Sequence, residues 1–263
     1  MNPYEGLNEF FKEHNKRIRQ ITEALNPMEQ LQSAIKASIV LPRIELPKFE
    51  LPQIEFPKIE LTKIEINYEK IERIVEHNSL NGWTITGEMD VNFYLNEELL
   101  GLESNKIDNL FVGYYESDNR RNYLMAKTVI LSGIEDRWGN ALNDCFELYE
   151  AEKYRVIIPL LITIIEGEIS DITESHLFGS RLLKEWEEKI LSEQEKMLII
   201  ISHSLYKYLS GKMFKPKPFA EERGLLINRN WILHGRDNPN LWTKVDVLKL
   251  INALSTFQFI KSK

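Results

Sequence analysis

Apolar residues recur along most of the chain at the three- and four-residue steps of amphipathic helices. Residues 4–39 form one such stretch, which Pro27 divides into two helices because proline fits best in a first turn. The Asn81-Gly82 pair predicts a turn, and 83–91 alternates like a strand but could equally begin a helix. Further helices are expected over 68–77, 107–115, 122–134, 142–148, 154–169, 180–191, 193–209, 220–234 and 243–260.

A five-residue repeat of the form Leu-Pro-x-Ile-Glu separates the first helices from the rest. Its prolines are Pro42, Pro47, Pro52 and Pro57. Proline at every fifth position excludes a helix and permits a strand only at an edge, so that 41–66 is predicted to be an extended arm. The arm is either a stiff spacer or, since each repeat carries an apolar pair, a strap that binds a second subunit or a partner.

The pattern therefore predicts an all-α protein, a helical array with one extended arm. Its expected regions are N-terminal helices at 1–40, the repeat arm at 41–66, a helical middle region at 67–142 and a helical domain at 143–263. A hydrophobic fraction of 43% and a charged fraction of 28% are those of an ordinary globular protein.

Several classes of site have no support in the sequence. No apolar run approaches the roughly 20 residues of a membrane span, and no signal peptide follows Met1. Cys145 is the single cysteine, which fits a reducing cytoplasm. The five histidines lack metal-binding spacing and the glycines form no phosphate loop, so neither a metal nor a cofactor is expected. His14, His77 and His203 are interpreted as structural.

Charge changes this picture in one region. The whole chain carries a net charge of −7, which argues against a nucleic-acid partner. From Lys212 onward, however, the chain has ten basic and four acidic residues. A basic C-terminal region can attract RNA phosphates even on an acidic protein.

This basic region contains a candidate catalytic motif, Asn228-Arg229-Asn230-Trp231-Ile232-Leu233-His234-Gly235. On a helix, Asn230 and His234 share one face, and Gly235 would end the helix in the left-handed conformation. The carbonyls of the last turn favour the imidazolium of His234, which can transfer a proton near neutral pH. An arginine can bind the phosphate, which together suits RNA cleavage without a metal. Spacing alone also allows a structural role, in which Arg229 and His234 merely decorate a helix end.

The motif resembles the signature of the HEPN (higher eukaryotes and prokaryotes nucleotide-binding) superfamily, an arginine followed by a polar residue and then a histidine. The apolar helix 154–167, which ends in Glu166-Gly167, and the helix 244–260 are similar to the core and closing helices of a bacterial branch. The resemblance covers about 143–263. Glu166 matches only loosely and is assigned no role.

The resemblance implies a helical bundle that forms a homodimer or larger oligomer, with the active site near the subunit interface. It also implies a metal-independent endoribonuclease of toxin–antitoxin or phage-defence systems, with an antitoxin or defence partner. His234 would be the general acid or base, Arg229 the phosphate clamp and Asn230 a positioning donor. Lys215, Lys217 and Arg236 are expected to bind RNA. Many HEPN proteins are inactive, so a dimerisation scaffold or RNA-binding module is the alternative.

Overall fold

The computed structural model describes residues 68–262, so the N-terminal helices and the repeat arm expected over 1–66 lie outside the described residues. The described part is helical and contains no strand, which confirms the all-α class there. Its main helices are α3 (Tyr68–Leu80), α4 (Val91–Tyr94), α5 (Ser104–Gly133), α6 (Asp136–Glu150), α7 (Tyr154–Thr173), α8 (Ser180–Leu191), α9 (Lys196–Tyr208), α10 (Arg229–Leu233) and α11 (Lys244–Lys261). No helix among them is long and apolar enough to cross a membrane.

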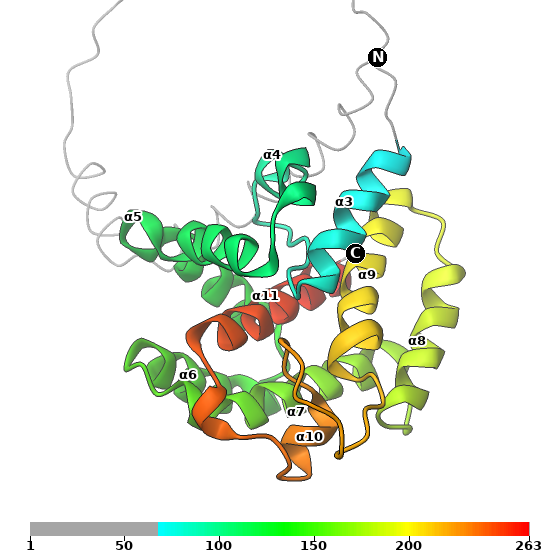
Figure 1. Cartoon of the computed structure of the whole chain (residues 1–263). Coiled ribbons are helices and arrows are strands. Elements are labelled where there is room, and N and C mark those ends of the chain that lie inside the picture. The colour runs from blue at the N-terminus through cyan, green and yellow to red at the C-terminus, as the bar shows by residue number, and fades with distance from the viewer. Residues whose placement is uncertain (1–67, 263) are drawn as a thin grey trace, which may run out of the picture. The chain divides into compact units, whose positions relative to one another are not determined.

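Helix α11 is the centre of this array, and Figure 1 shows it in red running between the other helices. Every residue from Asp246 to Phe259 is buried. The helix packs against α5 and α7 most extensively and also against α9. A helix that is covered on all sides must be enclosed by neighbours, which explains why its apolar residues do not form a single stripe. Asn67–Lys263 accordingly form one compact unit.

The segment 83–91, for which the sequence left strand and helix open, begins without regular secondary structure beside α11. Its backbone is satisfied by side chains of that helix instead of by a strand partner. Thr84 N–H donates to Oδ1 of Asn252 at 2.6 Å, and Nδ2 of Asn252 donates to the Thr84 carbonyl at 3.0 Å. The hydroxyl groups of Thr84 and Thr256 lie 2.6 Å apart. These buried bonds fix the segment without a sheet.

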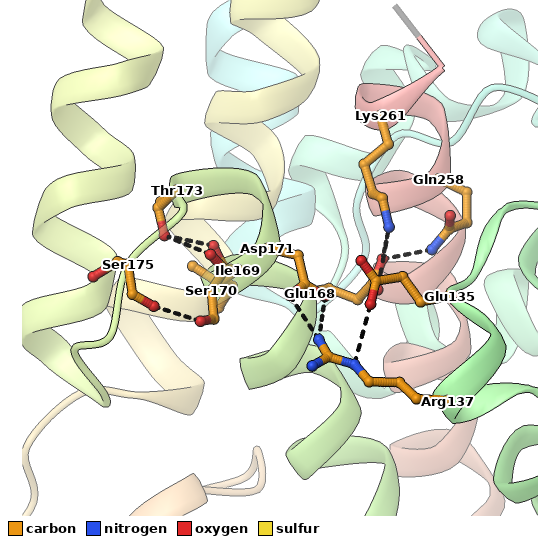
Figure 2. A network of polar contacts seen from close by, with 10 residues as sticks. All are labelled: Glu135, Arg137, Glu168, Ile169, Ser170, Asp171, Thr173, Ser175, Gln258 and Lys261. Atoms are coloured by element: carbon orange, nitrogen blue, oxygen red, sulfur yellow. Dashed lines mark hydrogen bonds and ion pairs between the residues drawn. The ribbon is translucent and has the colours of Figure 1, made fainter.

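A second polar network joins α6, α7 and α11, as Figure 2 shows. Glu168 of α7 accepts hydrogen bonds from Gln258 at 2.7 Å and from Lys261 at 3.3 Å, both on α11. On the next turn, Asp171 pairs with Arg137 of α6 at 2.6 Å. The network holds the end of α7 against α6 and α11. Burial raises the pKa of the Glu168 carboxyl, although the nearby charge of Lys261 opposes this shift.

Most expected helices are present, with boundaries that differ by a few residues. The helices expected at 107–115 and 122–134 belong to α5, which is interrupted at 117–120, where Asp118, Asn119 and Arg120 have positive φ. The helix expected at 180–191 is α8.

One expectation was wrong. The chain is irregular over 214–228 and becomes helical only at Arg229, so the helix expected over 220–234 is reduced to α10. Tertiary hydrogen bonds replace the helical ones here. Nδ2 of Asn228 donates to the carbonyls of Lys212 and Lys215 at 3.3 and 2.8 Å, and the indole N–H of Trp231 donates to the Lys217 carbonyl at 3.1 Å.

Candidate functional site

The candidate motif lies on α10, a helix of five residues with defined caps at both ends. Oδ1 of Asn228 accepts from the N–H groups of Asn230 and Trp231 at 3.1 and 3.3 Å. His234 is the C-cap, and its N–H donates to the Asn230 carbonyl at 3.1 Å. Gly235 follows with φ of 65°, the left-handed conformation that its position predicts. Asn230 and His234 are therefore one turn apart, and the helix both begins and ends within the motif.

Arg229 is held by a carboxylate from another helix. Its Nε donates to Oε2 of Glu166 on α7 at 3.1 Å, and its Nη2 donates to both carboxylate oxygens at 3.0 and 2.8 Å. Each side chain is only 16% exposed. The N–H of Gly179 also donates to Glu166, at 2.7 Å. The bidentate geometry is the strong form of an arginine–carboxylate pair and fixes the plane of the guanidinium.

The remaining edge of the guanidinium faces the motif itself. Nη1 of Arg229 donates to Oδ1 of Asn230 at 3.0 Å, and the ring of Phe214 lies 6.0 Å from the guanidinium carbon. Nη1 has two N–H donors, and the bond to Asn230 uses one. The second N–H of Nη1 has no hydrogen-bond partner among residues 68–262, so a bound anion can accept from it. The side-chain oxygen of Asn230 is an acceptor for Arg229, so its amide N–H2 is the part that can contact a ligand.

His234 is exposed, in contrast to the buried Trp231 and Ile232 beside it. Its ring lies 6.1 Å from Phe219 at an angle of 71°. Phe219 in turn lies 6.3 Å from Trp231 and 5.5 Å from the guanidinium carbon of Arg236. The imidazole is thus accessible to solvent and held beside an aromatic surface.

The three motif side chains line one groove of about 580 Å³. Two aromatic rings are part of its walls, since Phe178 and Phe219 line it and are 69% and 49% exposed. The rest of its lining is mainly the start of α8 and the loop before α10. It consists of Gly179, Ser180, Arg181, Pro216, Lys217 and Pro218.

The residues expected to bind RNA are spread over a wider surface. Lys217 lines this groove and also a second pocket, which Lys215 lines as well. Arg236 is exposed and reaches the groove only through Phe219. The Nζ of Lys217 lies 5.4 Å from the Trp231 ring.

Three groups that shape this site, Glu166, Phe214 and Phe178, were not predicted from the sequence. Glu166 was set aside because its match was loose, and its signal is that it is the first acidic residue after the apolar run of α7. Phe214 and Phe178 were not singled out, because nothing in their neighbourhood distinguishes them from core residues. Of the other histidines, His77 lies on α3 and His203 on α9, outside the groove. Residues 68–262 contain no cluster of three or more His, Cys, Asp or Glu that could bind a metal.

Comparisons with known proteins give no relative. No protein-family model, curated protein or solved structure matches this chain. The geometry of the groove and the motif at 228–235 are therefore the basis for inferring a function.

Proposed function

We propose that the protein is a metal-independent endoribonuclease of the HEPN type, with its active site in the groove lined by Arg229, Asn230 and His234. One observation carries the proposal: an accessible imidazole and a guanidinium of fixed orientation line the same open groove. A proton-transfer group and a fixed cation are the two components that phosphodiester transesterification needs.

The proposed reaction uses the 2′-hydroxyl of the RNA as nucleophile. His234 accepts the proton of this hydroxyl as the bond from O2′ to phosphorus forms. The bond from phosphorus to O5′ then breaks, and the imidazolium returns the proton to O5′. The products are a 2′,3′-cyclic phosphate and a 5′-hydroxyl, and the imidazole is neutral again. Arg229 donates its second Nη1 N–H to a non-bridging oxygen, where negative charge increases in the transition state.

The proposed substrate is single-stranded RNA. Phe178 and Phe219 expose their rings in the groove that contains the motif. Unstacked bases bind to exposed aromatic rings, whereas a duplex keeps its bases stacked within the helix. The basic Lys217 and Arg181 of the same groove would contact flanking phosphates.

The same proposal includes the assembly that the resemblance implies. The protein would act as a homodimer or larger oligomer, in the cytoplasm, as a toxin or phage-defence effector with an antitoxin or defence partner. The support for this part is the motif alone.

The test is cleavage of a single-stranded RNA by the purified full-length chain. His234→Ala is expected to lower the cleavage rate by about 10²-fold or more, because the proton-transfer group is lost. The matched control is His176→Ala, since His176 is also exposed and lies outside the groove. EDTA should leave the rate unchanged. Equal rates for His234→Ala and the parent would exclude the assignment.

A scaffold without catalytic activity is the second candidate, and one observation favours it. The pair of Arg229 with Glu166 joins α10 to α7, and such a pair stabilises a fold with or without catalysis. The two candidates differ in cells that express the chain at a high level. Growth arrest that disappears with His234→Ala, a change that leaves the Arg229–Glu166 pair intact, supports the nuclease. Equal growth of both strains supports the scaffold.

A further inference from the structure

A second pocket, of about 590 Å³, lies among the end of α3, the start of α5, α11 and the orange loop that precedes α10 in Figure 1. It has the volume of a small-ligand site, which is typically about 300–1,000 Å³. Neither Arg229 nor His234 lines it. It shares only Pro216 and Lys217 with the groove described above, so this loop forms a wall between the two cavities.

The charges of this pocket leave an excess of cations. Its lining includes five basic and three acidic residues. Two of the acids are already compensated. Asp237 accepts from Nε of Arg223 and from the Trp242 indole, both at 2.8 Å, and Asp108 pairs with Lys249 at 2.7 Å. Asp108 also accepts from the indole N–H of Trp83 at 2.8 Å.

The cations of the pocket that are not paired with an acid attract an anion. Lys212 and Lys215 have no ion-pair partner within residues 68–262, and both are exposed at the pocket. Glu221 is the one acid of the lining that has no cation partner among these described residues. The two ammonium groups therefore outweigh it, and a cavity lined by one sign of charge concentrates ligands of the other sign.

Arg223 adds a donor without an acceptor. Its Nε is bound to Asp237 and its Nη1 donates to the Gly224 carbonyl at 3.2 Å. Its Nη2 is buried and has no hydrogen-bond partner among residues 68–262. A buried guanidinium N–H without a partner costs free energy, and a phosphate oxygen is an acceptor of suitable geometry for it.

The same pocket has an apolar side. Leu80 and Leu225 line it with 37% and 84% of their surface exposed, and Leu226 and Trp231 complete this side. An exposed leucine at the mouth of a basic pocket gains from contact with an apolar ring. The ligand that fits both sides has a phosphate at one end and a flat, largely apolar group at the other.

We propose that this pocket binds a small organic phosphate with an aromatic ring, of the class of nucleoside monophosphates, with Arg223, Lys212 and Lys215 at the phosphate and Leu225 at the ring. The site is separate from the groove of Arg229 and His234 and does not depend on the nuclease proposal.

Isothermal titration calorimetry of the full-length chain with AMP tests the proposal, with inorganic phosphate and adenosine as partial ligands. AMP is expected to bind more tightly than either part, because it occupies both sides. Lys212→Glu should weaken AMP binding by about tenfold or more, since it places a negative charge beside the phosphate. Lys184→Glu, on the exposed side of α8 and outside the pocket, is the matched control and should bind like the parent.

Two further variants distinguish the parts of the pocket and the two cavities. Leu225→Ala changes a side chain that is 84% exposed, so the fold should be retained, and it should weaken binding of AMP but not of inorganic phosphate. His234→Ala, which leaves the Arg229–Glu166 pair intact, should leave AMP binding unchanged. The proposal is overturned if AMP does not bind, if Lys212→Glu binds it like the parent, or if His234→Ala alone abolishes binding, which would place the ligand in the other groove.

Discussion

The side chain of Arg229 has a structural role and a proposed catalytic role, and the two can be measured separately. Its Nε and Nη2 are bound to Glu166, which fixes the guanidinium and joins α10 to α7. Its Nη1 is directed to Asn230 and has a further N–H for a phosphate oxygen. Loss of activity in an Arg229 variant would therefore not identify a catalytic role by itself, and the structural part must be measured separately.

A double-mutant cycle measures that structural part. Glu166→Gln, Arg229→Gln and the double variant are compared by urea unfolding. The expected coupling is on the order of 1–2 kcal/mol, because the pair is bidentate and only 16% exposed on each side. The control cycle uses Lys207 and Glu76, a pair at 3.2 Å that is 44% and 54% exposed. Its coupling should stay below about 0.5 kcal/mol, and equal couplings in the two cycles would contradict the assignment.

Glu88 gives a prediction for pH. Burial raises its pKa above the ordinary 4.5, although a hydrogen bond from Ser255 at 2.6 Å opposes the shift. The folded state therefore holds the proton more tightly than the unfolded state. This stabilisation is complete below about pH 4.5 and is lost as the pH rises through the raised pKa.

The variant Glu88→Gln keeps an acceptor for Ser255 and cannot ionise. Its melting temperature should be close to that of the parent near pH 4 and should exceed it increasingly at higher pH. Thermal unfolding followed by circular dichroism from pH 4 to pH 8 measures the difference. Glu188→Gln, at an exposed position of α8, should show no such trend. A constant difference for Glu88→Gln across this range would contradict the prediction.

At the scale of single residues, the sequence indicated the candidate motif but not Glu166, which binds the arginine of the motif. Asn230 and His234 are four positions apart, so any helical geometry places them one turn apart. Glu166 lies 63 residues before Arg229, and no local pattern links them. The role of Glu166 could be recognised only after α7 and α10 had been placed side by side.

At the scale of elements, α10 depends on its N-cap. Asn228 is 9% exposed and binds the first turn of α10 with its oxygen and the carbonyls of Lys212 and Lys215 with its nitrogen. Asn228→Ala should therefore lower the free energy of unfolding by about 2 kcal/mol, more than a cap alone. Asn238→Ala removes a cap at an exposed position, and its cost should be about 1 kcal/mol or less. If chemical denaturation gives the same loss of unfolding free energy for both variants, the bonds from Asn228 to the two lysine carbonyls contribute little.

Helices were predicted correctly where the local pattern of apolar residues determines the structure. The prediction failed where hydrogen bonds to groups from other parts of the chain determine it. Helix α8 has a strong amphipathic pattern and was predicted at its observed bounds. The loop 214–228 was predicted as helix in part, because its hydrogen bonds go to groups that only the fold brings near. The segment 83–91 was left open for a related reason, since Asn252 is 168 positions away from Thr84.

At the scale of the molecule, α11 joins the regions expected as 67–142 and 143–263. It contacts α5 from the first region and α7 from the second, and residues 67–263 cluster as one compact unit. A chain of residues 67–263 should therefore fold on its own with the far-UV circular dichroism of a helical protein and a cooperative urea transition. A broad, non-cooperative transition would contradict this.

The arm, 41–66, stays a prediction, and the same truncation tests it. Mass measurement in solution compares the full chain with residues 67–263. A smaller oligomer after truncation is expected if the arm is a strap between subunits. An unchanged oligomer would leave the spacer as the remaining interpretation.

The shortness of α10 limits how the motif can be transferred. Five residues are far below the roughly 12–15 that an isolated helix needs in water. A synthetic peptide of residues 226–237 should therefore be unstructured, and grafting these residues onto an unrelated helix would supply neither the Glu166 carboxylate nor the aromatic walls. Any engineering that reuses this chemistry has to carry α7, the loop before α8 and the 214–228 segment as one block.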